Sequence, residues 1–348
     1  MNLTDFQGEG LMRLTVKQKR HLPVIFNFLV LGVLFGISIA VTLQNEISLF
    51  AFKRGALMGF LISFFSILGN YSFLLYFRKL PFSVYILIKT IYFSLIGVTI
   101  VLIGIQTIGE RPPGFNRSAI VVIIVFFTLL ISLFFNLILF FQRMIGVDVL
   151  RSFLSGKYHK PREEMRIFMF LDLVSSTEIA EKIGSLKFHN FLNEVFYDIT
   201  NAILNAGGEI YKYVGDEIIV NWKKDIGLKD NHCVEMFFDV KRILIENAPK
   251  YNSKYKVLPN FRAGLHMGKV IVGELGDYKR EISFLGDTVN TTARIQDMSK
   301  KEKKGLLVSE KILKQLSLPQ KYYTEYLGPI ELRGKKEKVE LYHVYERQ

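Results

Sequence analysis

The sequence predicts a two-part fold, in which a helical membrane domain with four transmembrane helices is followed by an α+β domain. Three observations support this. Between positions 22 and 141, four runs of 20 to 23 residues contain no charged side chain. Residues 1–150 hold 12 Lys/Arg and 5 Asp/Glu, whereas residues 151–348 hold 33 and 27. From residue 166, short apolar runs alternate with helical patterns. This division excludes a single globular domain and a disordered chain.

The four uncharged runs are predicted to cross a membrane. They are Leu22–Leu43, Gly55–Phe77, Thr90–Gly109 and Ala119–Phe141. As a helix rising about 1.5 Å per residue, each run reaches roughly 30 Å, the thickness of a hydrocarbon core. Buried helices of a soluble protein are the alternative, but four such runs leave too few residues for its polar surface. The length of the first run argues against a cleaved signal peptide.

Basic residues near the span ends predict the orientation. One side has Arg13, Lys17, Lys19, Arg20, Arg78, Lys79 and Arg143, and the other has Lys53, Arg54, Arg111 and Arg117 together with a Glu in each loop. The excess of basic residues on the first side places residues 1–21 in the cytoplasm as an N-terminal segment. Because the transmembrane domain, residues 22–141, has an even number of spans, the C-terminal domain is also expected at the cytoplasmic face of the inner membrane.

A charged connector, residues 142–165, joins the two domains. In it, Val147, Leu150 and Leu154 recur at three- and four-residue spacing, which predicts a short helix that ends at Ser155-Gly156. Such a helix suits pairing across a dimer axis, and it equally suits an amphipathic turn on the membrane surface. Both interpretations stay open.

The second domain is predicted to contain seven strands and three main helices. The strands are Ile167–Leu171, Glu209–Val214, Glu217–Trp222, Phe261–His266, Lys269–Glu274, Leu306–Val308 and Val339–Val344; the helices are Ser175–Asn205, Asn231–Asn247 and Thr288–Met298. We expect Ser175 and Glu178 to form a capping box, and Gly215-Asp216 to turn a hairpin. The order strand–helix–strand–strand–helix–strand is that of a ferredoxin-like α+β sandwich.

Two carboxylates are candidate metal ligands. Asp172 ends an apolar strand and Asp216 lies at the hairpin tip, so pairing of the hairpin beside that strand would bring both to one sheet edge. Two carboxylates at such a short distance repel each other unless a cation lies between them. Mg²⁺ or Mn²⁺ takes oxygen ligands of this kind. Ser175–Thr177 open the next helix, where free backbone N–H groups would face a phosphate. Taken alone, a strand-end Asp and a turn Asp are more often structural.

Four sequence blocks together carry a family resemblance. They are Phe170-Leu171-Asp172-Leu173-Val174-Ser175-Ser176-Thr177, Lys212-Tyr213-Val214-Gly215-Asp216, Gly264-Leu265-His266-Met267-Gly268 and Gly286-Asp287-Thr288-Val289-Asn290-Thr291-Thr292-Ala293-Arg294. Their order and spacing resemble the catalytic domain of class III nucleotidyl cyclases, the adenylyl and guanylyl cyclases. The resemblance assigns residues 166–348 to such a domain. It implies a homodimer whose ATP sites are shared between subunits.

The resemblance also implies roles for individual residues. Asp172 and Asp216 would hold two divalent metal ions, Mg²⁺ or Mn²⁺, one activating the ribose 3′-hydroxyl and the other binding the triphosphate. Asn290 would orient the ribose, and Arg294 would neutralise charge at the reacting phosphorus, a task that suits a planar, permanently charged side chain. Thr177 belongs to the phosphate-binding helix start. The family usually has Gly-Phe where this chain has Ser175-Ser176.

Recognition of the base and of the terminal phosphate rests on three further positions. Lys212 matches the lysine that reads adenine in the family, and Ser283 stands where many adenylyl cyclases have Asp. A hydroxyl can accept from adenine or donate to guanine, so Ser283 leaves guanine open. Lys335 matches the terminal-phosphate lysine, with Arg333 as an alternative.

The expected function is therefore an adenylyl cyclase that makes cyclic AMP and pyrophosphate from ATP at a homodimer interface, with the lipid bilayer as its other partner. Guanylyl cyclase and a non-catalytic nucleotide receptor are the alternatives. Val214 argues against a diguanylate cyclase, which needs Gly there, and the absence of carboxylates within the spans argues against a transporter. Lys300, Lys301, Lys303 and Lys304 lack interleaved aromatics, so no nucleic-acid partner is expected. The single cysteine, Cys233, cannot form an internal disulfide.

Overall fold

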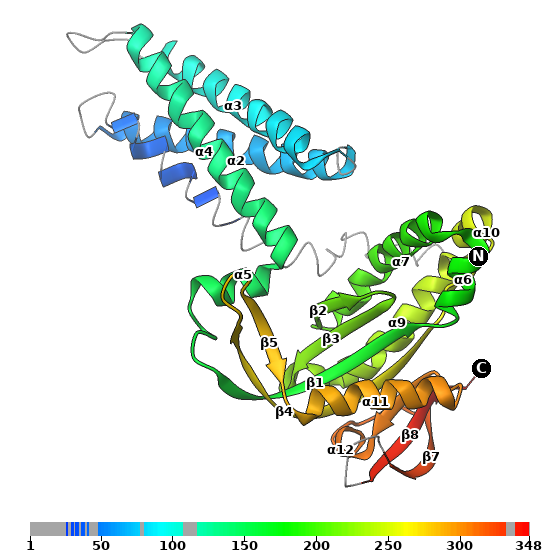
Figure 1. Ribbon diagram of the computed structural model, residues 1–348. Coiled ribbons are helices and arrows are strands. Elements are labelled where there is room, and N and C mark those ends of the chain that lie inside the picture. The colour runs from blue at the N-terminus through cyan, green and yellow to red at the C-terminus, as the bar shows by residue number, and fades with distance from the viewer. Residues whose placement is uncertain are drawn as a thin grey trace, which may run out of the picture. The chain divides into compact units, whose positions relative to one another are not determined.

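The computed structural model describes residues 48–76, 80–106, 117–331 and 338–347, together with scattered residues between 26 and 41 (Figure 1). Its contacts divide the chain into two compact units, one of residues 18–150 and one that begins at Arg151.

The first unit is helical. Its long helices are α2 (Leu49–Tyr76), α3 (Phe82–Gln106) and α4 (Arg117–Ile145). Within the described residues, two stretches are long and apolar enough to cross a membrane, Ala51–Gly69 and Phe82–Ile100. About half of the predicted first span lies outside the described residues, and residues 1–21, Arg78, Lys79 and Arg111 lie wholly outside them. The four-span arrangement and its orientation therefore remain predictions.

Glycines let α2 and the partly described helix before it approach each other closely. Gly32 and Gly36 of the partly described first helix face Gly55 and Gly59 of α2. A Cβ at Gly36 would lie 2.2 Å from the Gly55 carbonyl oxygen, and one at Gly59 would lie 2.0 Å from the Gly32 carbonyl oxygen. Pairs of glycines four residues apart are a common device for packing helices within a bilayer.

The second unit is built on one mixed β-sheet. Its strands are β1 (Arg162–Leu173), β2 (Glu209–Val214), β3 (Glu217–Lys223), β4 (Phe261–Leu275), β5 (Glu281–Leu285), β6 (Leu306–Ser309), β7 (Tyr322–Ile330) and β8 (Val339–Glu346). The order is β2-β3-β1-β4-β6-β8-β7, and β5 pairs with β4. The antiparallel run β4-β1-β3-β2 is the predicted ferredoxin-like order, to which β6 adds in parallel beside β4.

The helices of this unit are short except for three. In chain order, after α5 (Val147–Leu154), which spans the boundary at Arg151, they are α6 (Ser176–Ile183), α7 (Ser185–Asn205), α8 (Lys224–Leu228), the 3₁₀ turn Lys229–Asn231, α9 (His232–Glu246), α10 (Ala248–Tyr255), α11 (Asp287–Lys301) and α12 (Glu310–Leu313). Helices α7 and α9 share the main hydrophobic core with one face of the sheet. Helix α11 packs against β4 and forms a second, smaller core with β6 and β8.

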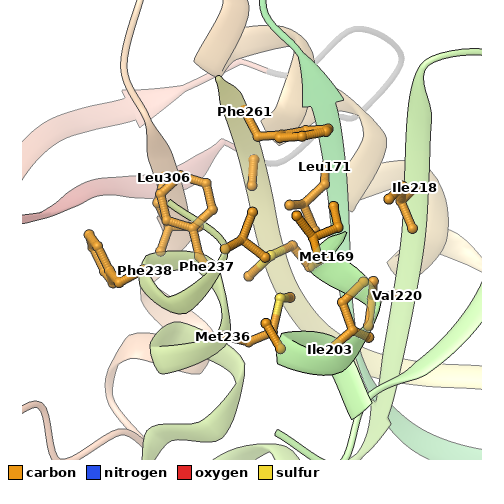
Figure 2. Packing of buried hydrophobic residues seen from close by; sticks show 14 of the residues in the cluster. Met169, Leu171, Ile203, Ile218, Val220, Met236, Phe237, Phe238, Phe261 and Leu306 are labelled. Atoms are coloured by element: carbon orange, nitrogen blue, oxygen red, sulfur yellow. The ribbon is translucent and has the colours of Figure 1, made fainter. Parts of the chain in front are cut away.

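Strand β1 is buried on both faces, which explains its unbroken run of apolar residues. Met169 and Leu171 point into the main core, which also contains Phe237 of α9 (Figure 2). Phe168, the residue before Met169, turns to the opposite face and packs edge-on against Phe284 of β5 at 5.4 Å between ring centroids. This position of β1 at the sheet's centre fixes the end of the strand, where Asp172 lies.

Several predicted boundaries were wrong. The long helix 175–205 is interrupted at Gly184, which has φ 81, and so forms α6 and α7. Ser175 has φ 56 and makes no capping bond through its side chain, so the capping box does not form. The two strands expected between Phe261 and Glu274 are one strand, and β5 and β7 were not predicted. Strand β1 begins at Arg162, inside the predicted connector.

Candidate active site

A group of carboxylates meets at one end of β1. The register pairs Asp172 of β1 with Glu217 of β3, which follows directly on Asp216 at the hairpin tip. Burial raises the pKa of Asp172, and the charge of Asp216 raises it further. Burial and then the charges of Asp172, Asp216 and Asp297 raise the pKa of Glu217 to about 7. The structure thus brings the two predicted metal ligands together in mutual repulsion.

Arg262 lies against this group and was not predicted as a site residue. It is the register partner of Asp172 on β4, and its Nε lies 3.2 Å from Oδ2 of Asp172. Its charge and that of Lys300 act to lower the pKa of Asp172, against the larger effects of burial and Asp216. The sequence feature that could have identified Arg262 is its position two residues before the Gly264–Gly268 block.

The donor set at this end of the sheet suits divalent metal ions. Asp172 and Asp216 offer hard oxygen ligands whose repulsion a cation would relieve. In the described part of the chain, no group of three or more His, Cys, Asp or Glu side chains is arranged to hold an ion unaided. Mg²⁺ is commonly held by one or two carboxylates together with substrate phosphates. Asp172 and Asp216 therefore fit metals that arrive with, or complete their coordination through, a nucleotide.

The start of α6 lies directly after these ligands. Ser175 is exposed and has φ 56, a left-handed conformation that Gly adopts without strain. This backbone angle explains why the cyclase family usually has Gly at the position of Ser175. Ser176 and Thr177 open the helix, and Thr177 is exposed. The first N–H groups of a helix have no partners within it, so they favour an anion at this position.

The two predicted base-selecting residues lie on β2 and β5, two strands that do not pair in the sheet but contact each other through side chains. Lys212 of β2 donates to Oε1 of Glu281 on β5 at 2.8 Å. This bond raises the pKa of Lys212 and lowers that of Glu281. Ser283 is buried two residues further along β5, with its Oγ 3.5 Å from the hydroxyl of Tyr211. Glu281 was missed from the sequence because β5 itself was missed.

Asn290 and Arg294 lie on the outward side of α11. Asn290 is exposed and Arg294 is half-buried, whereas Thr291 and Ile295 face the sheet. The helix can approach β4 closely because Gly264 faces it: a Cβ at Gly264 would lie 2.4 Å from the backbone nitrogen of Gln296. This close packing explains the glycine-rich block that the sequence analysis singled out.

Asn290 is distant from the carboxylate pair of its own chain. The α11 residue whose charge affects Asp172 is Lys300, ten residues further on. Ten residues correspond to about 15 Å along a helix axis. One chain therefore does not place Asn290 beside its own Asp172. Lys335 and Arg333, the predicted terminal-phosphate ligands, lie outside the described residues.

Comparison with known proteins identifies the family of the second half of the chain. The family model of the adenylate and guanylate cyclase catalytic domain matches residues 158–346. Adenylate cyclase 2 of Rhizobium meliloti (strain 1021) is 35% identical over 198 residues, which cover 57% of this chain and 54% of that protein. The adenylate cyclase of Anabaena cylindrica is 26% identical over 186 residues, covering 51% and 36%. This chain thus matches about half or less of the length of these relatives.

A solved structure shares the fold. The structure of a bacterial light-regulated adenylyl cyclase has a TM-score of 0.55 and 22% identity, and the match covers 63% of this chain and 64% of that one. At that identity the match shows the fold alone. Together with the family model, which spans more than half of the residues, it confirms the resemblance drawn from the four sequence blocks. The chain belongs to the class III adenylyl and guanylyl cyclase family through residues 158–346.

Proposed function

We propose that this protein is an adenylyl cyclase that converts ATP into 3′,5′-cyclic AMP and pyrophosphate. The observation that carries the proposal is the Asp172/Asp216 pair, with Arg262 against it and the start of α6 beside it. The 35% identity to an adenylate cyclase supports the same choice. In the reaction the ribose 3′-oxygen bonds to the α-phosphorus, the bond to the β-phosphate oxygen breaks, and the hydroxyl proton passes to solvent.

In this proposal the acidic side chains bind the metal ions, and the basic groups bind the phosphates. Asp172 and Asp216 would hold two divalent ions, which when bound supply positive charge to the attacking and leaving oxygens. Arg262 pairs with Asp172 in the absence of substrate. With cations on the carboxylates, its guanidinium is free to pair with phosphate oxygens, for which its planar fork is suited. The N–H groups around Thr177 bind a further phosphate oxygen.

The second half of the site comes from a second copy of the chain in this proposal. Asn290 and Arg294 face outward on α11 and lie ten and six residues, about 15 Å and about 9 Å, before Lys300, whose charge acts on Asp172. A two-fold dimer would place them opposite the carboxylates of the partner and generate two equivalent sites. Asn290 then orients the ribose, and Arg294 stabilises the charge that develops on the α-phosphate. Lys335 is proposed for the terminal phosphate.

Lys212 favours adenine as the base, but one residue near it also suits guanine. Lys212 and Ser283 flank the proposed base site, and the carboxylate of Glu281 lies between their strands at 2.8 Å from Lys212. A carboxylate accepts the amino group of adenine, and it also accepts the N–H groups of guanine. Guanylyl cyclase is therefore the second candidate function, and Glu281 is the observation that favours it.

The first half of the chain is proposed to anchor the cyclase in the inner membrane. Helices α2 and α3 include the stretches long and apolar enough to span it, and large apolar side chains such as Leu57 and Leu95 point outward from them. We retain the four-span domain of residues 22–141, the connector of residues 142–165 and a cytoplasmic catalytic domain as parts of the proposal. Helix α5 occupies the connector position at which a short helix was expected.

Product analysis tests the function. The detergent-purified full chain is incubated with ATP or GTP and with Mg²⁺ or Mn²⁺, and the products are identified by mass. Cyclic AMP from ATP alone is the expected result. Cyclic GMP as the main product would replace the proposal by the guanylyl cyclase alternative. No cyclic product under any condition, with nucleotide still bound, would favour a non-catalytic receptor.

A further inference from the structure

A fully buried arginine lies near the proposed base site. Arg166 of β1 is 2% exposed, and its guanidinium has five N–H donors. They are directed at Oε2 of Glu164 (2.9 Å from Nε and 2.7 Å from Nη2), Oε2 of Glu209 (3.2 Å), Oδ1 of Asn221 (2.9 Å) and the hydroxyl of Tyr158 (3.1 Å). Every donor direction thus has an acceptor. We call these five residues the Arg166 cluster.

The cluster joins segments that are distant in the sequence. Glu209 begins β2 and Asn221 belongs to β3, whereas Tyr158 precedes β1. The Tyr158 hydroxyl donates in turn to Oε1 of Glu164 at 3.0 Å. A buried guanidinium with all its partners present fixes geometry strongly, because any displaced member leaves one of its N–H donors without an acceptor.

The cluster reaches both base-selecting residues through aromatic rings. The ring of Phe284 lies over the Arg166 guanidinium, at 5.4 Å from its centroid, and Phe284 directly follows Ser283. Tyr211 packs edge-on against Phe284 at 4.9 Å between centroids, and it directly precedes Lys212. Tyr211 and Phe284, the sequence neighbours of Lys212 and Ser283, therefore pack on each other, and Phe284 packs on Arg166.

The segment Tyr158–Pro161 packs against the part of β4 that pairs with β5. The carbonyl oxygen of Tyr158 accepts the backbone N–H of Glu274 at 3.0 Å. Gly273, the preceding residue, is the register partner of Ser283. A Cβ at Gly273 would lie 3.2 Å from Cγ of Pro161, so the two segments of the chain are in close contact there.

Resting on the proposed function, we propose that Arg166 and Tyr158 are positioning residues for the nucleotide base. The Arg166 cluster sets the spacing between Lys212 on β2 and Ser283 on β5, and the Tyr158 hydroxyl completes it. The base contributes to binding but lies away from the reacting phosphorus, so a loosened cluster weakens nucleotide affinity and base choice more than turnover. Tyr158 lies eight residues after Leu150, where the helical unit ends, so movement of that segment would act first on nucleotide affinity.

The test compares two buried tyrosines that each lose a hydroxyl. Tyr158→Phe removes one member of the Arg166 cluster. Tyr251→Phe is the matched control, because the Tyr251 ring is fully buried and its hydroxyl donates to Oδ2 of Asp198 at 2.6 Å, among residues of α7 and α10. KM and kcat for ATP and GTP are measured for the full chain, together with amide hydrogen exchange of β2 and β5 without nucleotide.

Tyr158→Phe is expected to raise KM for ATP roughly three- to tenfold, the scale of one hydrogen bond, and to reduce the preference between ATP and GTP, while kcat changes less than twofold. Exchange in β2 and β5 should rise in Tyr158→Phe and stay unchanged in Tyr251→Phe. A fall in kcat alone, or equal effects of both variants, would overturn the positioning role. If the wild-type chain made no cyclic nucleotide, the proposed function would fail, yet exchange would still test the cluster: unchanged exchange in Tyr158→Phe would overturn it.

Discussion

The half-buried charge of Asp172 is expected to cost stability in the metal-free protein. Its pKa is raised by burial and by Asp216, and a carboxyl with a raised folded pKa stabilises the fold only below its unfolded value of 3.8. As the pH rises through the folded pKa, that contribution is lost. At neutral pH, Asp172→Asn should therefore unfold at a higher temperature than wild type in EDTA, while activity with metal falls about 10²–10³-fold.

Asp277→Asn is the control for that measurement, because Asp277 is exposed in the turn between β4 and β5, outside the carboxylate group. It should change the melting temperature and the activity little. A lower melting temperature for Asp172→Asn in EDTA would show that the pair with Arg262 outweighs the repulsion from Asp216. Such a result would remove the electrostatic argument for a cation at this position.

The single cysteine gives a pH dependence with a defined sign. Cys233 is fully buried, and burial raises the pKa of its thiol from 9.0 to about 12. The unfolded chain ionises from pH 9 upward while the folded chain does not, so stability falls as the pH rises between these values. The slope attributable to this thiol approaches about 1.4 kcal/mol per pH unit.

Urea unfolding of wild type and Cys233→Ala between pH 8 and pH 11 isolates that effect. Cys233→Ala is less stable overall because it leaves a cavity, but its stability should fall less steeply with pH than that of wild type. Parallel pH profiles for the two proteins would show that the thiol ionises freely in the fold. Native protein should also resist alkylation at pH 8 and react once unfolded.

At the scale of elements, the connection from β1 to α6 makes a prediction about two adjacent serines. Ser175 has φ 56 and makes no capping bond, so Ser175→Gly removes strain of about 1–2 kcal/mol and adds about 0.5–1 kcal/mol of unfolded-state entropy. The net expectation is a gain of about 0.5 kcal/mol with activity retained. Ser176→Gly, in the first turn of the helix, should instead lose about 0.5–1 kcal/mol. Chemical unfolding of both variants measures the difference, and equal effects would contradict the role assigned to the backbone angle.

The elements that the sequence predicted are those with a strong local signal. The hairpin around Gly215-Asp216 and helix α9 have clear periodicity and turn residues, and the structure has both. Strand β5 has only five residues, of which three are buried, and a charged turn precedes it. Gly184 interrupts a helical pattern that continues on both sides, so periodicity alone gave no reason to divide the helix.

The same reasoning explains which site residues were found. Asp172 and Asp216 stand out because each interrupts or follows an apolar strand. Glu281 and Arg262 have meaning only through partners, Lys212 and Asp172, that are 69 and 90 positions away in the sequence. Strand register brings those partners together, and no local pattern in a single sequence specifies register at that range.

At the scale of the whole molecule, the shared site predicts complementation between two inactive variants. Asp172→Asn damages the carboxylate half of a site and Arg294→Ala damages the α11 half. If each site takes one half from each subunit, a mixed dimer has one site with both lesions and one intact site. Random pairing of equal amounts makes half of the dimers mixed, so co-expression should restore about a quarter of wild-type activity per chain.

A second pair of variants distinguishes shared sites from any general rescue by dimerisation. Asp172→Asn and Asp216→Asn damage the same half, so every site in their mixed dimer carries one lesion, and no activity should return. The outward position of Asn290 and Arg294 on α11 requires this asymmetry between the two mixtures. Recovery in neither mixture would mean that each chain completes its own site, which would require α11 to move relative to β1 by about the 15 Å that separates Asn290 from Lys300 along the helix. Recovery in both would contradict the pairing of Asp172 and Asp216 as ligands in one site.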